Sequence, residues 1–285
     1  MRKMKMKSNL STPAASTATS QWLPGRISDQ LDPVFKKCAT HLTATLSFVI
    51  AVSALAFVLL AAPAKGKTLA SDAVFVAPSQ INAQLILPEP PSATSETTKT
   101  ELRELHRIES ARTPEQAAHA MADDKNESIF IFQAQMGEGF AAEKLPLTAA
   151  LSAKVGNDES VNTAPAKQGF RRVRPYNLDK TLHPVCTTKI KNDSYPSGHS
   201  TTGYLMALTL IDMLPEKRDL ILARADDYAH NRLVCGVHYP SDLQASKLLA
   251  YAIHAVMANT PQYRQELAAA RVELRQALGL TMAAN

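Results

Sequence analysis

The sequence predicts an all-α protein built as a single-domain helical bundle over residues 101–285. Three observations support this fold class. Helix-like apolar patterns occupy five stretches, at residues 147–155, 201–213, 216–232, 243–257 and 261–278. Patterns typical of strands are few. The chain has only ten glycines and no glycine-rich phosphate loop, so a nucleotide-binding α/β fold is not expected.

Helix start and stop signals agree with this fold class. Thr113-Pro114 and Thr260-Pro261 each place an N-cap residue before a proline at the first helical position. Gln116 completes a capping box with Thr113. Gly279 follows the last helical stretch, where a helix stop is expected.

The first hundred residues form three segments of different composition. Residues 1–40 are basic, and we expect a disordered extension. Residues 41–70 contain an uncharged apolar run, 42–62, that follows Lys36 and Lys37 and precedes small residues. This pattern predicts a signal peptide or an uncleaved signal anchor. Residues 71–100 are rich in Pro, Ser and Thr and are interpreted as a linker or a surface arm.

The charge of the chain follows the same division. The formal net charge is +5, but nine of the 31 Lys and Arg and two of the 26 Asp and Glu lie in residues 1–70. Residues 71–285 therefore carry 22 basic and 24 acidic side chains, and no nucleic-acid polymer is expected as a partner. Export predicts a periplasmic or secreted protein; in the alternative, residues 42–62 anchor it to the inner membrane. Exposed helices are also compatible with a homo-oligomer.

Two of the three cysteines remain in an exported mature protein, because Cys38 precedes the apolar run. An oxidising compartment favours a disulfide bond between the remaining two, Cys186 and Cys235. The alternative is a pair of free buried thiols.

The first chemical motif is a pair of cations. Lys167 and Arg174 are seven residues apart, nearly two helical turns, so one helix face is predicted to carry both. Pro175 is predicted to end that helix just after Arg174. The two cations suit an anion. A solvated basic face is the alternative, since Arg171 and Arg172 lie beside them.

The second motif is Pro196-Ser197-Gly198-His199, a turn that leads into the apolar stretch 201–213. A helix start offers unpaired N–H groups and the positive end of the helix dipole to a phosphate, and Gly198 lets the anion approach closely. His199 is then placed to give a proton to a leaving oxygen. An ordinary helix cap is the alternative.

The third motif runs from Arg232 to Asp242. Gly236 is predicted to break the helix after Arg232, and Pro240 suits the first position of the next helix. His238 then lies just outside this helix and Asp242 lies in its first turn. A carboxylate on one ring nitrogen leaves the other as a directed lone pair, which makes an imidazole a nucleophile. A buried histidine with a carboxylate partner is the structural alternative.

Together the motifs resemble the signature of the type 2 phosphatidic acid phosphatase superfamily: Lys, six residues, Arg-Pro; then Pro-Ser-Gly-His; then Ser-Arg, five residues, His, three residues, Asp. Within it the chain is similar to the class A bacterial nonspecific acid phosphatases, through Glu104-Leu105-His106, Leu145-Pro146-Leu147-Thr148 and Cys235-Gly236-Val237-His238. The departure is Asn231, which stands where the family has serine and still offers a hydrogen-bond donor.

The resemblance implies the helical bundle shared by these phosphatases and the vanadium haloperoxidases. It also implies a metal-independent acid phosphatase that needs no cofactor and hydrolyses small phosphate monoesters through a phosphohistidine, with phosphotransfer as a side activity. His238 would attack phosphorus, Asp242 would orient it, and His199 would protonate the leaving alcohol. The implied phosphate-binding residues are Lys167, Arg174, Ser197, Gly198 and Arg232.

Two other functions remain open at this point. A vanadate-dependent haloperoxidase would use the same anion-binding residues, because vanadate resembles phosphate. A non-catalytic phosphate-binding protein would keep these anion-binding residues but has no need of a nucleophile, an orienting acid and a proton donor.

Overall fold

The computed structural model describes residues 72–186, 188 and 190–281. The predicted basic extension (1–40) and the predicted signal peptide or anchor (41–70) lie outside this part of the chain. Among the described residues, none of the helices combines the length and the apolar character needed to cross a membrane.

The described residues form helices and no strand, which confirms the all-α prediction. The elements, in chain order, are α2 (Ala83–Ile86), α3 (Glu96–Ala111), α4 (Pro114–Asp123), the 3₁₀ helix η2 (Ile129–Phe132), α5 (Gln133–Met136), α6 (Pro146–Phe170), α7 (Pro175–Leu178), α8 (Gly198–Met213), the 3₁₀ helix η3 (Pro215–Lys217), α9 (Arg218–Val234), α10 (Pro240–Met257) and α11 (Pro261–Ala277). The capping box of Thr113 and Gln116 is present at the start of α4.

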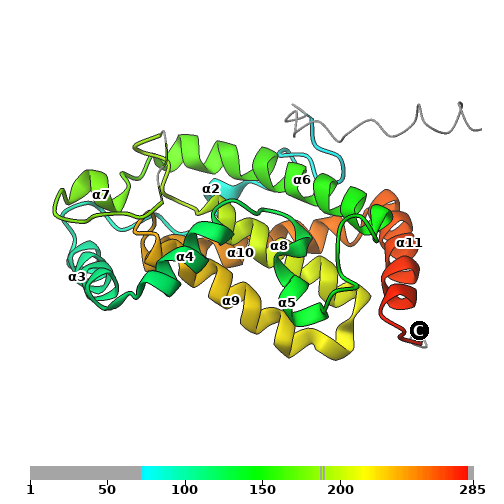
Figure 1. The fold of residues 1–285 in the computed structure, drawn as a ribbon. Coiled ribbons are helices and arrows are strands. Elements are labelled where there is room, and N and C mark those ends of the chain that lie inside the picture. The colour runs from blue at the N-terminus through cyan, green and yellow to red at the C-terminus, as the bar shows by residue number, and fades with distance from the viewer. Residues whose placement is uncertain (1–71, 187, 189, 282–285) are drawn as a thin grey trace, which may run out of the picture. The chain divides into compact units, whose positions relative to one another are not determined.

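Helix α8 lies at the centre of the fold and packs against α6, α9, α10 and α11 (Figure 1). Most of its side chains are buried, including the polar Ser200, Thr201 and Thr202, as expected of an enclosed helix. Gly203 leaves room for α9, since a Cβ atom there would lie 2.6 Å from the ring of Tyr228. The N-terminus of α8, which carries the second motif, is therefore held by helices on several sides.

Part of the predicted arm, residues 71–100, lies against the helical core. The buried carboxylate of Asp158, on α6, accepts hydrogen bonds from the backbone N–H groups of Val74, Phe75 and Val76 at 2.6–2.8 Å. Further along, the hydroxyl of Tyr195 donates to the carbonyl of Pro88 at 2.6 Å. Helix α3 begins at Glu96, inside the range interpreted as the arm.

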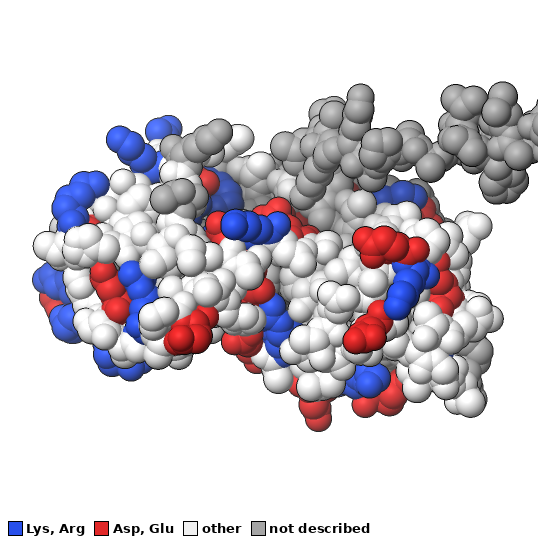
Figure 2. Space-filling model, in the orientation of Figure 1, with Lys and Arg blue, Asp and Glu red and all other residues white. Residues whose placement is uncertain are grey.

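On the face drawn in Figure 2, basic and acidic side chains are interspersed. This mixture agrees with the near balance of 22 basic and 24 acidic residues after residue 70.

The prediction that one helix carries both Lys167 and Arg174 is wrong. Helix α6 ends at Phe170, because Arg171 adopts the left-handed conformation, with φ of 49°. The chain then runs extended beside residues 191–194. The Ser194 N–H donates to Arg172 O at 3.1 Å and the Arg174 N–H donates to Lys191 O at 3.0 Å. Arg174 therefore caps α7 instead of closing α6.

Candidate active site

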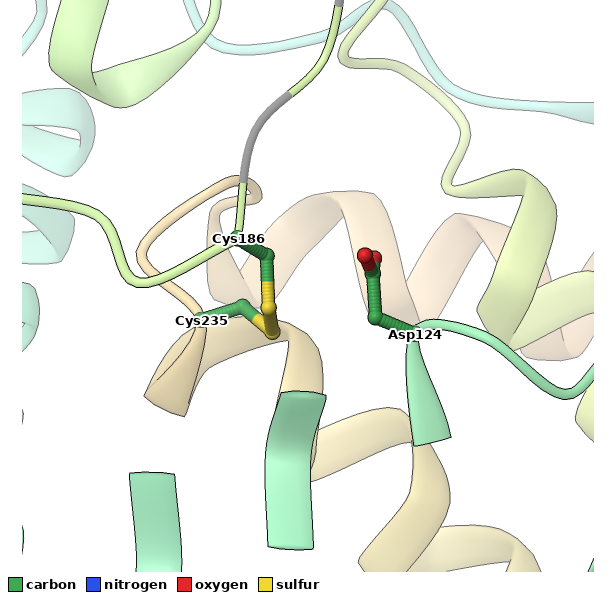
Figure 3. Close-up of side chains that lie close together, drawn as sticks. All are labelled: Asp124, Cys186 and Cys235. Carbon is green, nitrogen blue, oxygen red and sulfur yellow. A yellow bond between two sulfur atoms is a disulfide. The ribbon is translucent and has the colours of Figure 1, made fainter. Parts of the chain in front are cut away.

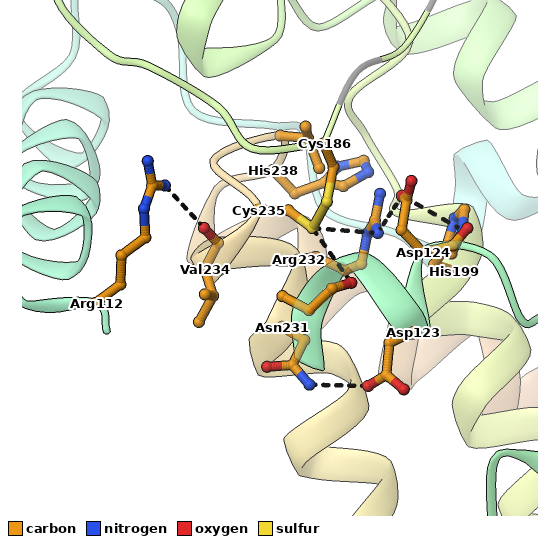
Figure 4. Close-up of a disulfide and its surroundings, with 12 residues drawn as sticks. Arg112, Asp123, Asp124, Cys186, His199, Asn231, Arg232, Val234, Cys235 and His238 are labelled. Atoms are coloured by element: carbon orange, nitrogen blue, oxygen red, sulfur yellow. Dashed lines mark hydrogen bonds and ion pairs between the residues drawn. A yellow bond between two sulfur atoms is a disulfide. The ribbon is translucent and has the colours of Figure 1, made fainter. Parts of the chain in front are cut away.

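A cavity of about 390 Å³ collects most of the residues predicted from the three motifs. Six of the eight line it: Lys167, Arg174, Gly198, His199, Arg232 and His238. The other two lie directly behind them, since Ser197 caps α8 and Asp242 contacts His238. Figure 4 shows His238, Arg232 and His199 gathered from different parts of the chain.

His238 is held from behind by Asp242. The chain breaks at Gly236, with φ of 76°, and α10 starts at Pro240, so His238 lies just outside the helix. Its Nδ1 atom lies 3.2 Å from Asp242 Oδ2. With the proton on Nδ1, the lone pair of Nε2 accepts from Arg174 Nη1 at 3.1 Å.

The surroundings of His238 favour a neutral ring. Burial holds the pKa of His238 well below its usual range, and the nearby Arg174 and Lys167 act in the same direction. A histidine with a depressed pKa stays unprotonated, and so nucleophilic, at acidic pH. The His238 ring therefore keeps a free lone pair on one nitrogen under acidic conditions.

Asp242 is itself fixed by a set of donors. Its Oδ2 accepts from Ser194 Oγ at 2.6 Å and from the Tyr239 N–H at 2.9 Å. Its Oδ1 accepts from Arg172 Nη1 at 2.7 Å, and Arg172 Nη2 reaches Glu101 Oε2 at 2.7 Å. Burial raises the pKa of Asp242, and Arg172 opposes this most strongly.

Glu101 and Arg172 were not among the site residues predicted from the sequence. Both are buried, and the Arg172 guanidinium also lies 3.9 Å from the ring centre of Tyr239. Arg and Glu are rarely buried without a partner, so two such residues in the core indicate an ion pair. The sequence does not show that these two are buried, because local spacing does not reveal burial.

The three cations of the cavity already have anionic or carbonyl partners. Lys167 Nζ donates to Asp193 O at 2.5 Å, and Arg174 Nε donates to Asp193 Oδ1 at 2.7 Å. Arg232 Nη1 donates to Asp124 Oδ1 at 2.6 Å. Burial and the neighbouring Arg174 lower the pKa of Lys167 to about 8, so it stays charged at acidic pH. These fixed charges suit a tetrahedral oxyanion.

The start of α8 lies at the same cavity, which Gly198 and His199 line. Ser197 is the N-cap, and its Oγ accepts from the Ser200 N–H at 3.3 Å. The carbonyl of Ser197 accepts from Ser246 Oγ at 2.9 Å, which fixes the turn against α10. A Cβ atom on Gly198 would lie 3.6 Å from Glu159 Oε1, an ordinary contact, so the protein itself leaves room for alanine there. The proposed reason for a glycine, close approach of an anion, stays a prediction.

His199 faces two acceptors at the end of α4. Its Nε2 atom lies 3.0 Å from the carbonyl oxygen of Asp124 and 3.1 Å from Glu127 Oε1. Its ring stacks against Tyr228, with ring centres 6.4 Å apart. Burial and then Arg232 lower the pKa of His199, while Glu127 and Asp124 act to raise it.

The structure joins Cys186 and Cys235 by a disulfide bond, with sulfur atoms 2.04 Å apart (Figures 3 and 4). The bond links the loop before α8 to the end of α9, three residues before His238. Figure 3 shows Asp124 beside the two sulfur atoms. Sulfur atoms bonded to each other offer no thiolate to a metal, and Asp124 already pairs with Arg232.

A second group of three ligand-type side chains, His119, Asp123 and Asp227, lies at the junction of α4 and α9. Arg224 donates to the carboxylates of both acids, at 3.0 Å and 2.6 Å through Nη1. Because the guanidinium holds these oxygens, the group is an ion-pair network and not a metal site. Asn231, the departure from the family motif, joins this network: its Nδ2 donates to Asp123 Oδ2 at 2.8 Å (Figure 4).

The family model of the PAP2 superfamily matches residues 145–266. This stretch contains all three motifs. Residues 145–266 are thus similar to the PAP2 superfamily. The superfamily resemblance predicted from the motifs is confirmed by this match.

Similar proteins bear the names expected from the motifs. The chain is 34% identical over 116 residues to a non-specific acid phosphatase of Providencia stuartii, which covers 39% of this chain and 46% of that protein. It is 35% identical over 139 residues to an acid phosphatase of Zymomonas mobilis subsp. mobilis, which covers 47% of this chain and 52% of that protein. The chain thus spans about half the length of these curated relatives.

Among solved structures, a bacterial vanadium-dependent iodoperoxidase is similar, with a TM-score of 0.49 and 17% identity. The superposition covers 62% of this chain and 53% of that chain.

Proposed function

We propose that this protein is an acid phosphatase of the PAP2 type that hydrolyses small phosphate monoesters without a metal ion, through a phosphohistidine at His238. The observation that carries the proposal is the placement of His238: Nδ1 lies 3.2 Å from Asp242, and the ring lines a cavity that also contains Lys167, Arg174 and Arg232. Relatives named acid phosphatases support the same reaction.

The proposed reaction has two transfers. In the first, the Nε2 lone pair of His238 forms a bond to phosphorus while the ester P–O bond breaks, and His199 gives a proton to the leaving oxygen. In the second, a water molecule loses a proton to His199 and attacks phosphorus, and the P–N bond breaks to return the electron pair to His238. An alcohol in place of water would give phosphotransfer.

The basic residues stabilise the charge that is transferred. Lys167, Arg174 and Arg232 would hold the three phosphoryl oxygens, together with Ser197 and the Gly198 N–H. Fixed cations and helix N–H groups need no reorganisation as the phosphoryl group moves, which is the main electrostatic requirement of this chemistry. Asp242 would stabilise the positive charge that His238 gains when it carries the phosphoryl group.

We also propose export to the periplasm or outside the cell. The apolar run 42–62 has the pattern of an export signal, and a disulfide bond between Cys186 and Cys235 suits an oxidising compartment.

The direct test is to quench turnover of a ³²P-labelled monoester in chelator-treated buffer and to look for label on His238. We expect His238→Ala to lose the label and to lower kcat by about 10³-fold or more. His230→Ala is the matched control, because His230 is exposed on α9, and it should keep both. Turnover that leaves no label on any histidine would overturn the covalent route. Halide oxidation with vanadate and peroxide, without phosphate release, would instead favour the haloperoxidase alternative.

A further inference from the structure

Glu127 lies beside the histidine that the proposed function uses as the proton donor. Its Oε1 atom is 3.1 Å from His199 Nε2, and its side chain is partly exposed, at 39%. We infer that Glu127 is the positioning residue of His199, so that the site contains two carboxylate–imidazole pairs: Asp242 with the nucleophile and Glu127 with the acid. This inference rests on the proposed function.

The segment that leads to Glu127 is fixed at two points. Glu127 lies between α4 and η2, and the last residue of α4, Asp123, pairs with Arg224 and Asn231. The carbonyl of Asn126 accepts from the Tyr228 hydroxyl at 2.7 Å. The same Tyr228 ring stacks on His199. The carboxylate and the imidazole are therefore held by one set of contacts, which is the preorganisation that a catalytic group requires.

The contacts of His199 determine which nitrogen donates. Nε2 faces two oxygen acceptors, Asp124 O and Glu127 Oε1, so Nε2 keeps its proton in either charge state. The proton available for transfer is then on Nδ1 of the imidazolium. As the P–O bond breaks, its electron pair stays on the leaving oxygen, the Nδ1 proton moves to that oxygen, and His199 becomes neutral. The negative charge of Glu127 stabilises the protonated ring before this transfer.

Several charged groups surround His199, and Glu127 and Asp124 act on its pKa in the direction opposite to Arg232. Its charged, titratable or stacked neighbours come from several elements. They are Asp124 and Glu127 after α4, Tyr228 and Arg232 on α9, and His238 before α10. On α6, Lys167 lines the same cavity and Glu159 interacts with Glu127. Burial and Arg232 lower the pKa of His199, whereas Glu127 raises it. Without Glu127, His199 should lose its proton at a lower pH.

The test is Glu127→Gln in the full chain, assayed with two monoesters. p-Nitrophenyl phosphate has a leaving group that needs little protonation, and glycerol phosphate has one that needs a proton. We expect kcat to fall about tenfold or more for glycerol phosphate and less than about threefold for p-nitrophenyl phosphate. The alkaline limb of the pH–rate profile for glycerol phosphate should move to lower pH. Glu127→Asp keeps the charge on a shorter side chain, so its loss of kcat for glycerol phosphate should be intermediate. This variant tests the same role if the glutamine variant does not fold.

The matched control is Glu143→Gln, an exposed glutamate outside the cavity, which should match the unchanged protein with both esters. Equal losses for the two esters with an unmoved pH profile, or no loss for either, would overturn the role of Glu127 alone. An unchanged protein that cleaves neither ester would overturn the proposed function, and this inference with it.

Discussion

Arg172 Nη1 donates to Asp242 Oδ1 at 2.7 Å, while the other oxygen of the same carboxylate lies 3.2 Å from His238 Nδ1. The second guanidinium nitrogen of Arg172 pairs with Glu101 of α3. A continuous line of charged groups thus runs from α3, through Arg172, to the proposed nucleophile. Each member of the line is buried.

Arg172→Lys should impair catalysis more than substrate binding. Lysine keeps the charge but cannot donate from two nitrogens to Asp242 and Glu101 at once, so Asp242 loses a fixed position. We expect kcat to fall by about tenfold to a hundredfold with KM nearly unchanged. The unfolding free energy should also fall, by about 3 kcal/mol, because a buried ion pair is left incompletely satisfied.

Arg107→Lys is the control for Arg172→Lys. Arg107 pairs with Glu104 on the exposed face of α3, where an ion pair contributes little. Steady-state kinetics and urea unfolding should therefore detect no change in this variant. If the two arginine variants behaved alike, Arg172 would have no special part in holding Asp242.

The sequence predicts the parts of the site that depend on local geometry. The contact of His238 with Asp242 follows from a four-residue spacing across a helix start at Pro240, and the structure has this helix start. The prediction that one helix carries Lys167 and Arg174 failed, because a helix pattern does not show that Arg171 adopts a left-handed conformation and that α6 ends at Phe170, four residues before Arg174.

The missed residues depend on contacts far apart along the chain. Glu101 reaches Arg172 from 71 positions away, and Glu127, just before η2, reaches His199 on α8, against which η2 packs. Single-sequence patterns contain the identity of such residues but not their partners. Packing of the helices decides which charged residues leave the solvent, and no local spacing encodes it.

Glu159→Gln should stabilise the protein at neutral to alkaline pH. Glu159 is buried on α6, and burial raises its pKa from 4.5 to about 7. The folded state therefore holds a proton between these pH values that the unfolded state has lost, and stability falls as the pH rises through this window. Above it the ionised group costs about 3 kcal/mol, by the linkage relation. Glutamine carries no charge and avoids this cost.

Urea unfolding at pH 4 and pH 8 checks the prediction for Glu159. The variant should match the unchanged protein at pH 4 and exceed it at pH 8, whereas the exposed Glu143→Gln should match at both. A gain of equal size at the two pH values would show that the effect has a cause other than ionisation of Glu159.

Replacing Cys186 and Cys235 together by alanine should destabilise the protein. The bond closes a loop across 49 positions, and a cross-link of this length contributes about 4 kcal/mol by restricting the unfolded chain. We expect a lower Tm for the double variant. Reductant should lower the Tm of the unchanged protein to about the same value and leave the double variant unaffected. A Tm of the unchanged protein that reductant does not move would contradict the prediction.

Gly236→Ala should lower both stability and activity. Gly236 has φ of 76°, and a Cβ atom there would lie 3.2 Å from Pro184 Cα, so alanine meets both backbone strain and a close contact with main-chain atoms. The expected loss is about 1–3 kcal/mol of unfolding free energy. The next residue, Val237, accepts from Arg174 Nη1 through its carbonyl at 2.9 Å, so a backbone shift at Gly236 also moves Arg174 and His238.

Gly137→Ala separates the two effects at Gly236. Gly137 also has a positive φ, 92°, but nothing lies within 4 Å of its Cβ position, and it is not a residue of the cavity. This variant should lose stability from backbone strain alone and keep its kcat. Gly236→Ala should lose more stability and should lower kcat in the fraction that remains folded, as measured by thermal unfolding and assay below the Tm. Equal kcat values for the two variants would contradict this prediction. They would show that the positions of Arg174 and His238 in the active site do not depend on the backbone conformation of Gly236.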